Sequence, residues 1–355
     1  MFRRASALLV AAALALTGCS RTAAKAPASD AAAGDPTGTR AGGAASDTAA
    51  AEAGPAEAAA PEAEAAGSEA LAGTGPFLWR VEGRAPTYLF GTIHVPDERV
   101  LTLSPSVVKA FTDSAAVYTE IPMDSATQMG VMGKVMLPDG TQLSQVIGEP
   151  LYNRMTAAAE KTLGGEHAAL GAILGPLFQR MKPWAAMSQL SLLEFLPDIM
   201  AGKQPLDAML YARAQAEGKK VGALETPDEQ IAVFESFTLA EQTRMLELTL
   251  DEIERVKPGG RTQTQELIDA YLSGDMAVVS NVMEEAMAGD RALMARFQEI
   301  AIVRRNNHMT ERILALRKEQ PSTVLFVAVG TAHYAGPTGI VAQLQKAGLK
   351  VTRVP

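Results

Sequence analysis

The sequence predicts a domain of the α/β class, with a central, mainly parallel sheet that carries a large helical insertion. Two observations predict this fold. A strand–helix–strand unit stands at each end of the apolar part of the chain, residues 76–355, and such units favour parallel strands joined by a right-handed crossover. The segment between the two units has its apolar residues at helical spacing, which predicts the insertion.

The first unit begins with the apolar run Thr87-Tyr-Leu-Phe-Gly-Thr-Ile-His94, which is typical of a buried strand. Ser104 and Pro105 follow as an N-cap and a first helical residue. A second strand is expected over Ala115–Ile121.

The second unit has an apolar strand over Ser322–His333, a helix from about Thr338 to Ala347 and a strand over Leu349–Val354. Between the units, a short strand is expected over Lys219–Glu225, and helices are expected over Gln189–Met200, Pro205–Glu217, Pro227–Phe237, Leu239–Val256, Gln263–Ser273 and Arg291–Arg317. We expect these helices to cover one end of the sheet.

Residues 1–18 have the pattern of a bacterial signal peptide. Arg3 and Arg4 give a basic start, and the apolar run through Leu16 is too short to span a bilayer. The segment leads into Leu-Thr-Gly-Cys19, which resembles a lipobox. In a lipobox the cysteine sulfur is acylated and the chain is cut before the cysteine, which becomes the new N-terminal residue. Two acyl chains give stable anchoring, so we expect a membrane lipoprotein attached through Cys19. An ordinary secretory signal with a chance cysteine is the alternative.

Residues 19–75 consist mostly of Ala, Gly, Pro, Glu, Ser, Thr and Asp. Such a segment buries too little apolar surface to offset its conformational entropy, so we expect a disordered tether. Ser20, rather than Asp, follows Cys19, which resembles the pattern of outer-membrane sorting. We therefore expect the cell envelope, and in a Gram-negative cell the periplasmic face of the outer membrane.

Composition excludes some classes of function. The formal net charge is -8, and no dense stripe of Lys and Arg is present, so nucleic acid is not an expected partner. Cys19 is the only cysteine, which leaves no thiol for catalysis or disulfides once it is acylated. The sequence has no His-Glu-x-x-His, no Gly-x-Ser-x-Gly and no phosphate-binding glycine-rich loop.

Two of the four histidines stand in the same motif, Gly-Thr-x-His, at His94 and at His333. Each closes a predicted strand, and the carboxyl ends of strands in an open α/β sheet are the usual place for a ligand. The alternative is that each imidazole is a hydrogen-bonded structural residue at a strand end. His167 is expected in a solvated loop, and His308 on a helix that could face either way.

Two carboxylates, Glu120 and Glu225, close their strands in the same manner. Two imidazoles and a carboxylate form a recognisable site for a divalent metal, which would polarise a carbonyl and activate water. Glu225 would then be a general base or a partner of an imidazole. The alternative is that both carboxylates cap the helices that follow them.

The stretch that contains Met123, Met129, Met132 and Met136 has two structural interpretations. Methionines of this kind either line an adaptable groove for peptides or fill the core.

At these residues the chain resembles the TraB/GumN family, whose eukaryotic relatives include Tiki-type metalloproteases. The resemblance runs from about Phe77 to Val354. The segments that carry it are Leu78-Trp-Arg80, Tyr88-Leu-Phe-Gly-Thr-Ile-His94, Glu120-Ile-Pro122, Leu206-Asp207 through Val221, Leu224-Glu-Thr226, Arg305-Asn306, and Val329-Gly-Thr-Ala-His333 with Gly336 and Gly339.

The resemblance implies that His94, Glu120 and His333 form a metal-dependent centre holding Mn, Co or Zn. It adds Arg305 and Asn306 as further polar members, and an arginine there suits an oxyanion or a substrate carboxylate. Tyr334 departs from the family, which more often has an apolar residue at this position. The domain is also similar to erythromycin-esterase-type folds, in which paired histidines work without a metal.

The leading hypothesis is a metal-dependent hydrolase of the peptidase type, tethered to the envelope membrane, with a peptide or small envelope molecule as substrate. A metal-free esterase with one histidine as general base is the second hypothesis. A non-catalytic envelope lipoprotein that binds a ligand is the third.

Overall fold

The computed structural model describes residues 75–164, 168–257, 259–286 and 289–355. The predicted signal peptide, Cys19 and the tether lie outside these residues, as does His167. Within the described residues, no helix combines the length and apolar character needed to cross a membrane.

A six-stranded sheet forms the base of the fold, in the order β4-β3-β5-β2-β1-β6. Its strands are β1 (Leu78–Val81), β2 (Thr87–Thr92), β3 (Ala116–Thr119), β4 (Lys220–Ala223), β5 (Leu325–Gly330) and β6 (Val351–Arg353). The four strands β4, β3, β5 and β2 are parallel, whereas β1 is antiparallel to both of its neighbours. The predicted α/β class with a mainly parallel sheet is confirmed.

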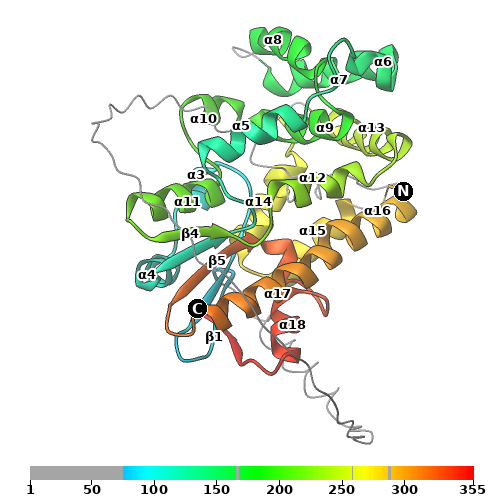
Figure 1. Ribbon diagram of the computed structural model, residues 1–355. Coiled ribbons are helices and arrows are strands. Elements are labelled where there is room, and N and C mark those ends of the chain that lie inside the picture. The colour runs from blue at the N-terminus through cyan, green and yellow to red at the C-terminus, as the bar shows by residue number, and fades with distance from the viewer. Residues whose placement is uncertain (1–74, 165–167, 258, 287–288) are drawn as a thin grey trace, which may run out of the picture.

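Helices cover both faces of this sheet (Figure 1). α4 (Pro105–Asp113) and α11 (Leu206–Ala216) lie on one face, and α17 (Arg304–Glu319) and α18 (Ile340–Lys346) lie on the other. The short α3 (Glu98–Leu101) and the 3-10 turn η4 (Thr331–Tyr334) connect strands to these layers. The predicted N-cap of α4 is confirmed, since Ser104 accepts from the Val107 amide.

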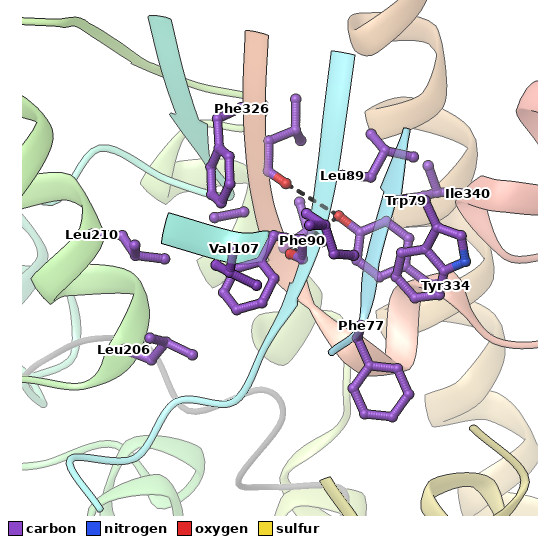
Figure 2. Packing of buried hydrophobic residues seen from close by; sticks show 14 of the residues in the cluster. Phe77, Trp79, Leu89, Phe90, Val107, Leu206, Leu210, Phe326, Tyr334 and Ile340 are labelled. Atoms are coloured by element: carbon purple, nitrogen blue, oxygen red, sulfur yellow. Dashed lines mark hydrogen bonds between the residues drawn. The ribbon is translucent and has the colours of Figure 1, made fainter. Parts of the chain in front are cut away.

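The core of the sheet is aromatic on both faces. On the side of α18, Trp79 packs on Tyr334 with ring centroids 4.8 Å apart, and Ile340 lies beside them (Figure 2). On the other side, Phe326 meets Phe90 and Phe111 at 5.7 and 5.4 Å. Tyr334 is fully buried and its hydroxyl donates to the carbonyls of two strands, which explains how a phenol is accommodated in this layer.

The helical insertion stands over the carboxyl edge of the parallel strands (Figure 1). Its helices are α5 (Ser125–Lys134), α6 (Leu143–Ile147), α7 (Glu149–Leu163), α8 (Ala168–Phe178), α9 (Pro183–Leu192), η2 (Leu193–Phe195), α10 (Leu196–Met200), α12 (Pro227–Glu235), α13 (Leu239–Arg255), α14 (Gln263–Ser273), α15 (Met276–Ala286), α16 (Arg291–Phe297) and the π-helical segment η3 (Gln298–Val303). The insertion has a hydrophobic core of its own, in which Trp184 stacks on Phe234.

Several details differ from the sequence prediction. Strand β1 and helices α3, α5 to α8 and α15 were not predicted, and the helix predicted over Gln189–Met200 is the end of α9 followed by η2 and α10. β1 and α3 are only four residues long, and glycines interrupt α5 and α8. The helix predicted over Arg291–Arg317 is continuous but contains η3. Strands β2 and β5 end at Thr92 and Gly330, before the two histidines, and Thr331 then donates its hydroxyl to the Thr92 carbonyl.

The first motif glycine is required by packing. A Cβ on Gly91 would lie 2.7 Å from Thr331 Oγ1 and 2.8 Å from Phe77 Cβ. We therefore predict that Gly91→Ala destabilises the protein by about 1–3 kcal/mol, the usual range for overpacking, as measured by urea unfolding. The control is Gly133→Ala in α5, where no atom lies within 4 Å of the new Cβ and helix propensity favours Ala. Equal stability of the two variants would contradict this account of Gly91.

Candidate active site

Five side chains form one polar centre at the carboxyl edge of the four parallel strands: His94, Glu120, Glu225, Arg305 and His333. Four of them come directly after a strand, in the order Glu225 after β4, Glu120 after β3, His333 after β5 and His94 after β2. None of the five residues is more than 8% exposed. The polar centre lies at the junction of the sheet core and the insertion core, since Tyr118 belongs to the first and Ile121 to the second.

Glu120 is hydrogen-bonded through both carboxylate oxygens. Oε1 accepts from the Gly330 amide at 2.8 Å, and Oε2 accepts from Arg305 Nη2 at 2.5 Å and from Gln230 Nε2 at 3.0 Å. Burial by itself would raise the pKa of Glu120, but Arg305, His333 and His94 hold that pKa well below its usual range. The carboxylate is therefore charged inside the protein.

Gly330, the glycine of the second motif, lies between Glu120 and His94 because β5 lies between β3 and β2. A Cβ at this position would be 3.2 Å from Glu120 Oε1 and 3.4 Å from His94 Nε2. The glycine therefore lets the β5 backbone approach the polar centre closely.

Arg305 is the cation that holds the two carboxylates. Its Nε donates to Glu225 Oε1 at 3.0 Å and its Nη2 donates to Glu225 Oε2 at 2.6 Å, which makes a bidentate ion pair. The same Nη2 reaches Glu120, and Gln230 donates to both carboxylates. Burial opposes the charge on Arg305, but the two glutamates raise its pKa.

His333 is held neutral by its surroundings. Its Nδ1 lies 2.7 Å from Asn306 Oδ1, and the Asn306 amide nitrogen donates to the Thr338 carbonyl at 2.9 Å. This orientation of Asn306 assigns the ring proton to Nδ1 and leaves Nε2 as the acceptor for Arg305 Nη1 at 3.2 Å. Burial, and then the charge of Arg305, lower the pKa of His333 to about 3.

His94 is placed differently, beside an acid on the helical layer. Its Nδ1 lies 3.0 Å from Oδ1 of Asp207, the second residue of α11, which is itself buried. Burial lowers the tendency of His94 to be charged, but Asp207 and then Glu120 outweigh it and raise the pKa of His94 to about 9. Its Nε2 lies 3.8 Å from Glu120 Oε1, beyond hydrogen-bond distance. This Nε2 is therefore the ring atom left for a water or a substrate.

The structure brings together every residue that the sequence analysis placed in the site: His94, Glu120, Glu225, Arg305, Asn306 and His333. Two of them have their polar atoms engaged within the protein: Glu225 is bound through both oxygens by Arg305, and Asn306 contacts His333 Nδ1 and the Thr338 carbonyl. His308 is half exposed and faces Glu229 at 3.6 Å, away from this set.

Two buried members have no role in the sequence analysis, Asp207 and Gln230. An acid in the first turn of a helix usually serves the helix dipole at the surface. The one signal for Asp207 was its place in a segment that carries the family resemblance, which gave it no role. Gln230 stands one turn inside α12, the helix that begins two residues after Glu225, and only this spacing could have placed it beside the polar centre.

The four methionines divide between the two readings. Met123 and Met136 pack against the insertion core, whereas Met129 and Met132 on α5 are exposed. Core filling accounts for the first pair, and the peptide groove stays a prediction for the second.

A family model describes most of the folded part of the chain. The model of the TraB/PrgY/gumN family matches residues 77–353, which is more than half of the chain. The chain belongs to the TraB/PrgY/gumN family. The match covers both Gly-Thr-x-His motifs and every residue of the polar centre, and it confirms the resemblance seen in the sequence.

Curated relatives of this TraB/PrgY/gumN-family chain carry the name metalloprotease. Metalloprotease TIKI2 of Xenopus tropicalis is 30% identical over 315 residues, 79% of this chain and 60% of that protein. Metalloprotease TIKI1 of Danio rerio is 29% identical over 314 residues, 79% and 63% of the two chains. Human Metalloprotease TIKI1 is 28% identical over 317 residues, 79% and 62%. The chain thus spans less than two thirds of the length of these relatives, and no solved structure matches it.

The relatives' names imply a metal, and the polar centre as folded does not fit one. His333 Nε2 accepts from Arg305, and Glu120 Oε2 accepts from Arg305 and Gln230, so two of the three predicted ligands have donor atoms already in use. Among the described residues, no three His, Cys, Asp or Glu side chains are grouped to hold one ion. Arg305 supplies the positive charge here, and the metal stays a prediction.

We predict that Arg305→Met destabilises the protein by about 3–5 kcal/mol, because it leaves Glu120 and Glu225 buried without a cation. Chemical unfolding measures the difference. Adding Glu225→Gln to this variant should recover part of the loss, since one buried charge is then removed. Arg180→Met, which removes a solvent-exposed pair with Asp139, is the control and should cost under about 1 kcal/mol. Similar losses for the Arg305 and Arg180 variants would contradict the role given to Arg305.

Proposed function

We propose that the chain is a protease-like hydrolase whose reaction takes place at the polar centre. The observation that carries the proposal is the position of His94, which has Asp207 behind one ring nitrogen and Glu120 in front of the other. An imidazole oriented by a carboxylate is a common general acid–base group. The names of the relatives support hydrolysis of peptide bonds as the class of reaction.

Each residue of the polar centre then has a role. In its neutral form, which a pKa of about 9 makes more populated toward alkaline pH, His94 accepts a proton from the attacking water at Nε2 and then returns it to the leaving group. Asp207 fixes the orientation of the ring. The N–H groups of Arg305 are all engaged, by Glu225, Glu120, His333 and the Ala301 carbonyl, so Arg305 is a positioning residue that keeps Glu120 charged beside His94. Glu225 and Asn306 are positioning residues, the first for Arg305 and the second for His333.

A metal-dependent form of the same hydrolysis, with Mn, Co or Zn, is the second candidate. The relatives' names favour it, and so does the contact of Asp207 with His94, because a carboxylate behind an imidazole is typical of metal-binding histidines. Binding would require His333 to give up its contact with Arg305, so we derive no step through the ion.

The test uses the purified protein with a pool of quenched fluorescent peptides and p-nitrophenyl esters. The wild type should hydrolyse members of the pool, and His94→Gln should lower the rate at least about 100-fold through loss of acid–base catalysis. His308→Gln, which removes the half-exposed imidazole, is the control and should hydrolyse the substrates at the wild-type rate. Treatment with EDTA and return of Mn, Co or Zn then separates the two candidates.

Two results would count against a hydrolase: an inactive wild type with and without metal, or full activity of His94→Gln. Cleavage of esters alone would favour the esterase-type alternative. Tight peptide binding without hydrolysis, unchanged in His333→Ala, would favour a non-catalytic envelope lipoprotein.

We further propose that lipid on Cys19 anchors this hydrolase to the envelope membrane, at the periplasmic face of the outer membrane in a Gram-negative cell. The support is the sequence of residues 1–20 alone. The substrate would then be a peptide or small molecule of the envelope.

We predict that Cys19→Ser moves the protein from the membrane fraction to the soluble periplasmic fraction, because the acyl chains are lost. Cell fractionation with labelled palmitate measures both changes. Ser20→Ala, next to the lipidated residue, is the control and should stay labelled. A Cys19→Ser protein that remains in the membrane fraction would overturn the lipid anchor without affecting the hydrolase proposal.

A further inference from the structure

A cavity of about 420 Å³ lies in the helical insertion and shares no residue with the polar centre. Its walls come from α7, α9, η2, α13 and α14. The volume is within the usual range for a small-molecule site, and Leu190, Ile253 and Val256 provide apolar walls. The residues that decide its chemistry are Glu194 and Gln263.

Glu194 contributes a carboxylate that lacks a cation. Its oxygens accept from the Thr262 hydroxyl at 3.0 and 3.3 Å. Among the described residues, the groups that act on its charge are Thr264, Thr262 and Asp97 and include no cation, and burial raises the pKa of Glu194. A carboxylate removed from water in this way gains free energy when a cation approaches it.

Gln263 also lines this cavity and carries a second buried acceptor. It is 7% exposed, and its Oε1 has no hydrogen-bond partner among the described residues. A buried carbonyl oxygen without a donor is energetically unfavourable, and a ligand N–H group that reached it would remove this cost. Both uncompensated atoms therefore call for the same ligand chemistry, a nitrogen that carries hydrogens.

The other charged residues of the lining are already paired or solvated. The Lys161 ammonium donates to the carbonyls of Ile253, Glu254 and Val256, which end α13. Glu252 is paired with Arg255 at 2.5 Å. Lys257 is exposed, so water screens its charge. Glu194 is left as the charge that a ligand would meet.

We propose that this cavity binds an organic cation, an ammonium or guanidinium group on an apolar stem, with Glu194 as its counter-ion and Gln263 as a second acceptor. A basic side chain of a peptide and a free alkylamine share this chemistry. The site does not depend on the hydrolase proposal, because it uses none of the same residues.

The test is calorimetric titration of the purified full-length protein with N-acetyl-lysine amide, n-butylamine and the uncharged N-acetyl-norleucine amide. Binding of the lysine compound alone identifies a peptide side chain, and binding of both amines identifies a free amine as sufficient. The norleucine compound should bind at least tenfold more weakly than the lysine compound. Equal binding of these two, or no binding by either amine, would overturn the proposal.

A variant of Glu194, a control variant and a cavity-filling variant of Ser191 test whether the amine binds in this cavity. Glu194→Gln keeps an acceptor for Thr262 but removes the charge, and should weaken amine binding at least tenfold. Glu247→Gln, a carboxylate of α13 outside the lining that pairs with Arg244, is the matched control and should bind as the wild type does. If Glu194→Gln fails to fold, Ser191→Leu fills the same cavity and should abolish binding. Wild-type binding by a folded Glu194→Gln or Ser191→Leu protein would show that the amine binds elsewhere.

Discussion

The structure depends on one buried guanidinium. Arg305 binds Glu225 through two nitrogens, shares one of them with Glu120, and approaches His333 with a third. Each carboxylate would be costly to bury alone, and the attraction to Arg305 offsets that cost only in this geometry. Strands β3, β4 and β5 and helix α17 each contribute one member, so the arrangement fixes the helix at the carboxyl edge of the sheet.

This cluster also separates two hydrophobic cores. The sheet core ends at the carboxyl edge, the insertion core begins beyond it, and the polar centre lies between them. Apolar packing specifies neither the angle nor the register between two such layers strongly, whereas directional hydrogen bonds to charged groups do. The π-helical segment η3 lies directly before Arg304, and π-segments within helices occur frequently at functional sites. Arg305 follows it and reaches both glutamates and Nε2 of His333, and Asn306 reaches the other ring nitrogen of His333.

The two histidines look alike in the sequence, yet their surroundings make them chemically different. Asp207 and Glu120 favour the charged form of His94, while burial and Arg305 favour the neutral form of His333. Perturbed pKa values of this kind cluster at functional sites. The sequence motif, Gly-Thr-x-His in both cases, does not contain this difference. The glycines differ too, since Gly91 makes room for Thr331 and Phe77, and Gly330 makes room for the polar centre.

The sequence by itself determined the fold class, most of the helices after residue 200, and the meeting of His94, Glu120, Glu225 and His333. These follow from local patterns and from one general rule, that parallel strands bring their carboxyl ends to the same edge of a sheet. Only the tertiary structure decided the strand order, in which β5 stands between β2 and β3, and the antiparallel place of β1. It also decided the contact of Asp207 with His94 and the use of Arg305 as the central cation. The reason is physical: helix periodicity and caps act over a few residues, whereas these contacts join segments that are far apart in the chain and depend on how the layers pack.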